Sequence, residues 1–228
     1  MRWPGRVIIA CLMAGLITQR IPAQSTTRST TLTTLLIVDL TSPKAAARTL
    51  WNAVTAEDAA VVAQALDAAS NDDRELNEAI AALLVAGRGL SDEAREKFGK
   101  AADPVGRPML DTTDLQKLQA ANVTETGDSA TIQIEGNPKP LSLRRREGKW
   151  RVVISDFAGA TPENRRQQIK LVRDLASAVQ ELKMEIASGK YQTPQEAERY
   201  IQERLHEVMT EKYRPASAPS TRAVPTTR

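Results

Sequence analysis

The spacing of apolar residues changes twice along this chain and divides it into three segments. Across residues 42–101, apolar side chains recur every three or four positions, which is typical of amphipathic helices. Across residues 123–157 they alternate with polar ones, as in strands that have one dry face. The helical spacing returns across residues 161–213. This order predicts an α+β fold in which the first helices pack on a curved antiparallel sheet and an antiparallel helical pair follows.

Capping residues predict four helices in the first segment. Ser42 precedes Pro43, and proline is favoured at the first helical position behind a serine or threonine cap. Thr55 with Asp58 resembles a capping box that would open the next helix. Gly87 is a suitable left-handed stop for the third helix. The predicted helices cover residues 43–54, 55–69, 72–86 and 92–101.

Residues 127–157 predict three short antiparallel strands. Glu147-Gly148 supplies a two-residue turn before the last strand, because glycine adopts positive φ without strain. Val153 and Phe157 are apolar on the second face of that strand, so we expect it to be covered on both faces rather than to lie at a sheet edge. The positions expected on the dry face are Ala130, Ile132, Ile134, Leu141, Leu143, Trp150, Val152 and Ile154.

Two further helices are predicted after the sheet. Proline again follows threonine at Thr161 and at Thr193, where Glu196 completes a capping box. Gly189 is placed to end the first helix, and the short connection that follows favours an antiparallel hairpin. We therefore expect a helical hairpin over residues 160–213 and a Pro/Ser/Thr-rich tail, with little that can pack, over residues 214–228.

The N-terminus has the layout of a secretory signal peptide. Arg2 and Arg6 precede an apolar run over residues 7–17, and we expect cleavage after Ala23. The run is shorter than the ~20 apolar residues that a membrane-spanning helix needs. A retained anchor and a lipid anchor on Cys11 are the alternatives. We expect export to the periplasm or the cell exterior, with a Thr/Ser-rich disordered linker over residues 24–34.

Removal of the signal segment changes the charge and the cysteine content. The segment holds three of the 31 basic residues and no acid, so the remaining chain carries 28 bases against 28 acids. A general attraction to nucleic acid or to an anionic membrane then loses its support. Cys11 is removed as well, so the exported chain has no cysteine and depends on its apolar core rather than on disulfides.

Several motifs resemble those of the nuclear transport factor 2-like superfamily, in its small exported bacterial members. They are the Ser-Pro-x-x-Ala-Ala opening at Ser42, a helix start near Ala56, Gly127-Asp128-x-Ala, and Gly148-Lys149-Trp150. The resemblance covers residues 42–157. It implies a cone-shaped α+β domain over residues 35–159, whose helices pack into a strongly curved antiparallel sheet. It implies little about activity, because this superfold hosts isomerases, cyclases, transport factors and modules without a ligand.

No catalytic, metal-binding or nucleotide-binding motif accompanies these patterns, so we expect no cofactor and no metal. His206 is the only histidine, and we expect it to be solvated. Enzymes with the cone fold use acids or a tyrosine inside the cavity, so the resemblance directs attention to Asp114, Asp128 and Asp156. Asp156 shares strand parity with the dry-face positions. It is the catalytic candidate, as the buried general base of an isomerase-like or cyclase-like enzyme.

The strongest local concentration of charge is basic and lies in the last two predicted strands. Alternation places Arg144 and Arg146 outward and Arg145 on the side of the apolar positions. Two interpretations are open: a solvated strand face, or a binding site for an anionic partner such as a polymer or a membrane surface. Arg145 could instead pair with an acid such as Asp156.

These observations favour an exported, non-enzymatic binding or interaction module of the bacterial envelope, with the cavity enzyme as the alternative. Its partner would be a protein or a small ligand, bound through Arg144, Arg145 and Arg146. The C-terminal helices could also form a homodimer. We expect no nucleic acid as a partner and no stable membrane span.

Expression of the whole chain in a bacterium tests export. We expect the intact mass of the protein in the envelope fraction to correspond to a chain that begins at Gln24, since Ala23 lies at the end of the short polar segment after the apolar run. A cytoplasmic chain that keeps residues 1–23 would contradict this expectation. A chain with a lipid on Cys11 would support the anchored alternative instead.

Overall fold

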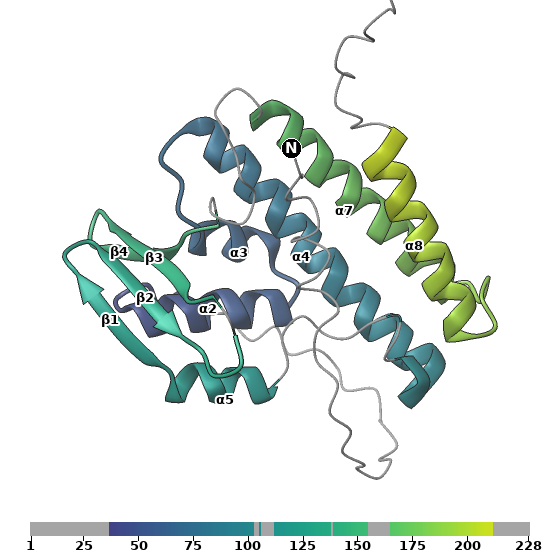
Figure 1. Cartoon of the computed structure of the whole chain (residues 1–228), viewed down its shortest axis with the longest axis horizontal. Coiled ribbons are helices and arrows are strands. Elements are labelled where there is room, and N and C mark those ends of the chain that lie inside the picture. Colours follow the sequence, from purple (N-terminus) through teal and green to yellow (C-terminus); the bar gives the residue numbers. More distant parts are fainter. Residues whose placement is uncertain (1–36, 103–104, 106–111, 138, 155–164, 212–228) are drawn as a thin grey trace, which may run out of the picture.

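A computed structural model describes residues 37–102, 105, 112–137, 139–154 and 165–211 of the chain. These residues form helices and one antiparallel sheet, which confirms the α+β class. Figure 1 shows the sheet and the last helix on opposite sides of the molecule, with α4 (Asn71–Phe98) and α7 (Arg165–Ala187) between them. The helices are α2 (Pro43–Thr55), α3 (Ala59–Ala65), α4 (Asn71–Phe98), the 3₁₀ helix η1 (Gly99–Ala102), α5 (Thr112–Ala120), α7 (Arg165–Ala187) and α8 (Pro194–Glu211). The strands are β1 (Asn122–Thr126), β2 (Ser129–Gln133), β3 (Leu141–Arg146) and β4 (Lys149–Val152).

The start of α2 is as predicted, whereas the start of α3 is not. Ser42 caps α2, since its hydroxyl oxygen accepts a hydrogen bond from the Ala45 N–H at 3.2 Å. Thr55 does not cap α3, because it is the last residue of α2. The cap of α3 is Asp58, whose carboxylate accepts from the Val61 N–H at 3.0 Å. The predicted capping box at Thr55 is therefore wrong.

The predicted third and fourth helices are one continuous helix, α4, which passes through Gly87 and Gly89. A glycine inside a helix costs only about 1 kcal/mol relative to alanine, which tertiary packing can offset. At Gly89 a Cβ atom would stand 2.5 Å from Lys183 Nζ of α7, so the missing side chain makes room for the end of the Lys183 side chain. The stop predicted at Gly87 is therefore wrong, and Gly99, with φ of 59°, ends the helix instead.

Within the described residues, the sheet contains four antiparallel strands in the order β1-β2-β3-β4, rather than the three that alternation predicted. The additional strand, β1, is mostly polar and pairs with β2 from Asn122 opposite Gln133 to Thr126 opposite Ser129. The predicted turn between β3 and β4 is confirmed, with positive φ at both Glu147 and Gly148.

The last strand lies at one end of the sheet within the described residues, contrary to our expectation. Its outer edge is nevertheless hydrogen-bonded. The Trp150 N–H donates to the Leu40 carbonyl, and the Val152 carbonyl accepts from the Asp67 N–H, each at 2.8 Å. Short segments before α2 and after α3 therefore cover the edge of β4 and protect it from further strand pairing.

Two apolar clusters form the described core. The first fills the space between the dry face of the sheet and helices α2, α3 and α5. Its members include Val54, Val62, Leu66, Leu118, Ala130, Ile132, Leu143, Trp150 and Val152. The second joins α4 to α7 and α8, and includes Leu90, Ala94, Val179, Leu182, Ile186, Tyr191 and Ala197. None of the described helices is long and apolar enough to cross a membrane.

Helix α7 runs beside α4 in the same direction, as Figure 1 shows. Arg165, the first residue of α7, pairs with Asp73 in the first turn of α4 at 2.9 Å. Farther along both helices, Lys183 approaches Gly89. The C-terminal helices thus share a core with a helix of the region that the sequence assigned to the α+β domain.

Truncation of Leu182 tests whether α7 belongs to the folded core. This side chain is 1 % exposed, so we expect Leu182→Ala to lower the free energy of unfolding by about 2–5 kcal/mol through lost burial and the cavity left behind. Met184, on the same helix, is 56 % exposed and supplies the matched control. Chemical denaturation that gave the same midpoint for Leu182→Ala and Met184→Ala would contradict the shared core.

Candidate functional site

Asp67 lies in the connection between α3 and α4 and is held there through its backbone. The chain leaves α3 in an extended conformation at Leu66, which forms a bridge with Val152 of β4. The Asp67 N–H donates to the Val152 carbonyl at 2.8 Å, and its own carbonyl accepts from Asn77 Nδ2 at 3.0 Å. The connection is thus tied to the sheet on one side and to α4 on the other.

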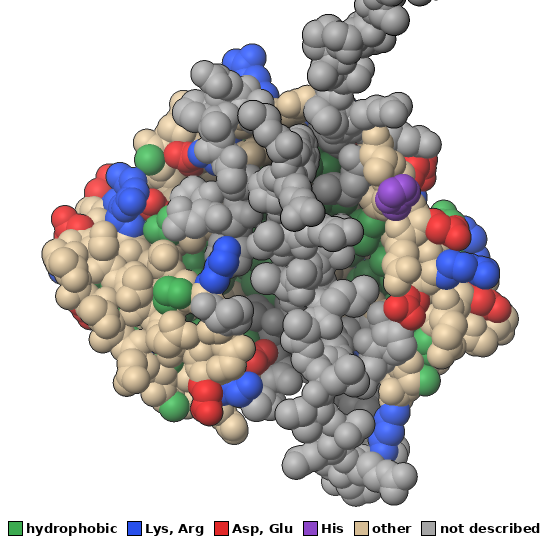
Figure 2. Space-filling model, in the orientation of Figure 1, with side chains coloured by type: hydrophobic (Ala, Val, Ile, Leu, Met, Phe, Trp, Pro, Cys, Tyr) green, Lys and Arg blue, Asp and Glu red, His purple; other side chains and the backbone are tan. Residues whose placement is uncertain are grey.

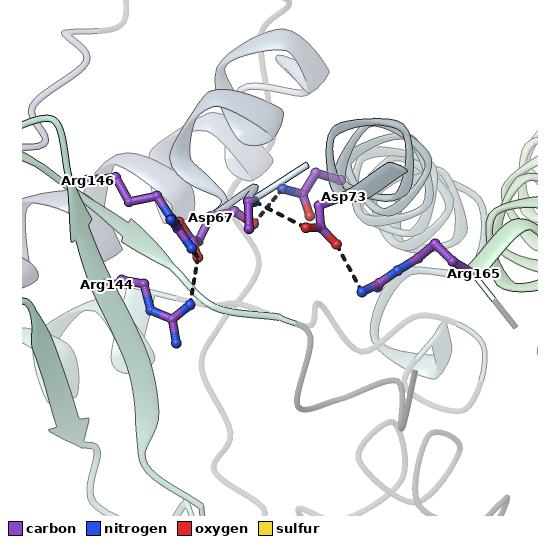
Figure 3. Close-up of polar contacts among 7 residues, drawn as sticks. Asp67, Asp73, Arg144, Arg146 and Arg165 are labelled. Atoms are coloured by element: carbon purple, nitrogen blue, oxygen red, sulfur yellow. Dashed lines mark hydrogen bonds and ion pairs between the residues drawn. The ribbon is translucent and has the colours of Figure 1, made fainter. Parts of the chain in front are cut away.

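Two arginines of β3 converge on the buried carboxylate of Asp67, as Figure 3 shows. The Asp67 side chain is only 6 % exposed. Arg146 Nε donates to Oδ1 at 2.6 Å and its Nη2 to Oδ2 at 3.4 Å. Arg144 Nη1 lies farther away, 3.7 Å from Oδ2. The hydrogen bond to Asp67 and the negative charge of that residue raise the pKa of Arg146 above its ordinary value.

Alternation placed Arg144 and Arg146 on the polar face of the sheet, and their side chains do lie opposite the buried Leu143. They are not a plain solvated face, however, because both turn toward Asp67. Arg146 is bound firmly, whereas the looser contact of Arg144 leaves most of its guanidinium donors available.

Arg145 lies apart from this cluster. It is paired across the sheet with Trp150, and its guanidinium carbon stands 5.3 Å from the centre of the Trp150 ring. Its Nε donates to Asp128 Oδ1 at 2.9 Å. Asp156, the partner that the sequence suggested, lies outside the described residues. Within the described part of the chain, Arg145 therefore belongs to an exposed pair at the β1–β2 turn.

A second ion pair stands next to the Asp67 cluster. Asp73 accepts a hydrogen bond from the Ala69 N–H at 3.1 Å and lies 2.9 Å from Arg165 Nη2. The Arg165 side chain is only 13 % exposed. Sequence reasoning missed Asp67, Asp73 and Arg165 as site residues. Ser70, which caps α4 and accepts from the Asp73 N–H, is the one local signal that could have placed Asp73 at a helix start.

These two ion pairs border a pocket of about 150 Å³ between the sheet and the first turns of α4 and α7. One part of its wall is charged and another part is apolar. The lining residues are Asp67, Ala69, Asp73, Leu76, Asn77, Ile80, Arg144, Ile154 and Arg165. The ion pairs at the pocket join Arg144, Arg146 and Arg165 to Asp67 and Asp73. This cluster of three arginines and two aspartates carries a formal charge of one positive unit. Such a pocket can accept a small molecule that has an anionic end and an apolar body.

The carboxylates proposed from the cone resemblance are not brought together. Asp114 is half-buried on α5, Asp128 is exposed at the β1–β2 turn, and Asp156 lies outside the described residues. The dry face of the sheet is filled, since Ile132, Leu143 and Trp150 are at most 2 % exposed. The part of the structure that is described therefore places no acid over an open cavity on that face.

Other candidate groups have ordinary surroundings. His206, the purple side chain in Figure 2, is exposed on α8. Figure 2 also shows acidic and basic side chains intermixed over the described surface on this side of the molecule. Among the residues that the structure describes, no three His, Cys, Asp or Glu side chains gather in a way that could hold a metal ion.

A third polar cluster fixes the connection between α7 and α8. Glu185 accepts hydrogen bonds from Lys190 and from the Tyr191 hydroxyl, and the Lys190 ammonium lies 4.7 Å from the centre of the Tyr200 ring. Burial and the hydrogen bond to Glu185 raise the pKa of Tyr191. Burial opposes ionisation of Glu185, but these two donors hold its pKa below the ordinary value. Because the groups satisfy one another, we assign this cluster a structural role.

Comparison of the chain with protein-family models, with curated proteins and with solved structures finds no match.

Replacement of Asp67 tests whether its carboxylate holds the cluster together. We expect Asp67→Asn to lower the free energy of unfolding by about 1–3 kcal/mol, because it leaves two arginines without their buried counter-charge. Asp128→Asn is the control, since that carboxylate also pairs with an arginine at 2.9 Å but is 72 % exposed. Its cost should stay below about 1 kcal/mol. Equal costs for both variants in urea denaturation would contradict the role of Asp67.

Proposed function

We propose that this protein is an exported, non-enzymatic binding module of the bacterial envelope, and that it binds a small anionic ligand between the sheet and α4. One observation carries the proposal: Arg144 and Arg165 line the same pocket as Leu76, Ile80 and Ile154. A cationic group beside an apolar wall in a concave site is the usual arrangement for an orientated small ligand.

Export is supported by the N-terminal sequence. Basic residues, a short apolar run and the small residue Ala23 follow one another as in a signal peptide. The balance of acids and bases after residue 23 also supports a specific anion site over general attraction to polyanions. Cleavage after Ala23 is therefore part of the proposal, as is the anion-binding site.

A binding role has more support than the cavity enzyme. A general base needs a lone pair within hydrogen-bonding reach of the substrate proton. Both carboxylates of the pocket are already engaged: Asp67 accepts from Arg146 through both oxygens, and Asp73 pairs with Arg165 and accepts from the Ala69 N–H. The filled dry face argues in the same direction, because the alternative requires an open cone cavity.

The cone-type domain of the nuclear transport factor 2-like superfamily remains part of the proposal as the scaffold of this site. Its support is the curved-sheet pattern of the sequence, together with helices α2, α3 and α5 on one face of the observed sheet. A protein partner, including a second copy bound through α7 and α8, has less support. Met184 is the large apolar side chain that this helical pair exposes within the described residues.

Removal of the positive charge of Arg144 tests the proposed function. We expect at least one small anion, from a panel of carboxylates, phosphate and sulfate at constant ionic strength, to raise the unfolding midpoint of the exported chain. For a chain of this size, each kcal/mol of binding free energy corresponds to about 2–4 °C. Arg144→Gln should abolish the shift, because the anion loses its main donor.

Arg48→Gln is the matched control for this experiment, since Arg48 is a half-exposed arginine that lies 3.8 Å from its partner Asp39, outside the pocket. It should keep the full shift. The proposal fails if no anion in the panel stabilises the protein, or if both variants respond alike. Constant ionic strength separates site binding from general screening of surface charge.

A further inference from the structure

We infer that the ligand of this pocket is a small monocarboxylate whose carboxylate meets Arg144 and whose ring or short branched chain lies against Ala69, Leu76, Ile80 and Ile154. The inference rests on the proposed function and names its ligand class. It is carried by three properties of the described pocket: its charge, its free donors and its apolar wall.

The charge of the cluster matches a single negative charge. Arg144, Arg146 and Arg165 are opposed by Asp67 and Asp73, so these ion-paired groups leave one positive unit in a partly buried site. Arg151, which is paired with Arg144 across the sheet, does not line the pocket. A monoanion neutralises this positive unit. A dianion would leave an excess negative charge beside the buried Asp67 and the partly buried Asp73, which is unfavourable.

Arg144 is the group with donors to offer. Within the described residues its one polar side-chain contact is the approach to Asp67 at 3.7 Å, and the side chain is 49 % exposed. The planar guanidinium of arginine presents paired N–H donors that fit the two oxygens of a carboxylate. Arg165 is held closer to its aspartate, at 2.9 Å, and is only 13 % exposed, so we expect it to contribute mainly positive potential.

The apolar lining residues and the volume of the pocket limit the chemistry and size of the ligand beyond its carboxylate. Leu76 is only 3 % exposed, and Ile80 and Ile154 pack against the first apolar cluster, so the pocket also has an apolar part beside its charged groups and Asn77. A cavity of about 150 Å³ accommodates a molecule of about the size of benzene. A long acyl chain exceeds this volume, and inorganic phosphate would leave the apolar wall without a partner.

Titration of the full exported chain with defined probes tests the ligand class. The probes are benzoate and 3-methylbutyrate as monocarboxylates, benzamide as the uncharged counterpart, inorganic phosphate and succinate as multivalent anions, and decanoate as the long chain. We expect benzoate or 3-methylbutyrate to bind, with benzamide about tenfold weaker or more, because the charge-assisted pair to Arg144 is lost. Calorimetry at constant ionic strength measures each affinity.

A variant that fills the pocket without touching a charge separates this inference from general anion binding. Ala69 is exposed and lines the pocket, so Ala69→Leu adds bulk there without disturbing buried packing. We expect it to weaken monocarboxylate binding about tenfold or more while the unfolding midpoint of the free protein stays unchanged. Ala60→Leu, at an exposed position of α3 away from the pocket, is the control and should bind as the original chain does.

The outcomes distinguish the two claims. If phosphate or succinate binds through Arg144 and the monocarboxylates do not, the proposed function stands and the inferred ligand class is overturned. If decanoate binds more tightly than benzoate, the size limit is wrong and the inference also falls. Monocarboxylate binding that Ala69→Leu leaves intact would place the ligand elsewhere and overturn the inference. Absence of binding by every probe would overturn both.

Discussion

The buried carboxylate of Asp67 is the constraint on which the site depends. A carboxylate that is 6 % exposed must be compensated by positive charge and hydrogen bonds, and Arg146 and Arg144 supply them. Because the Asp67 backbone is also bonded to Val152 and Asn77, the same residue joins the edge of the sheet to α4. Arg146 meets most of this requirement. The ion pair with Asp67 therefore positions Arg144 while most of its N–H donors stay available for a ligand.

The second requirement is that α4 stays continuous, because it contributes to both apolar clusters. Ala81 of α4 lies in the cluster below the sheet, and Leu90 and Ala94 lie in the cluster shared with α7 and α8. Gly89 leaves room for the end of the Lys183 side chain of α7 at this contact. The same alignment of the two helices brings Arg165 to Asp73, so helix packing far from the pocket determines one side of the pocket.

Features of local origin could be predicted from the sequence. Ser42 as a cap, the Glu147-Gly148 turn and the alternation of Ala130 and Ile132 each depend on neighbouring residues alone. The predictions that failed depend on distant partners. The continuation of α4 through Gly87 depends on its packing against α7, and the polar strand β1 is stabilised by pairing with β2 rather than by its own pattern. The sequence identified the arginines of β3 as a concentration of positive charge. It did not identify their partner Asp67, which lies 79 positions before Arg146 and has no local pattern that links it to β3.

The most direct measurement of the central claim is a crystal structure of the protein with bound benzoate. We expect the carboxylate oxygens within hydrogen-bonding distance of the Arg144 guanidinium and the ring against Ile80 and Ile154, with Arg146 still bonded to Asp67. Benzoate bound at another place would contradict this expectation. So would a pocket without benzoate at saturating concentration, in which Arg144 still contacts only Asp67.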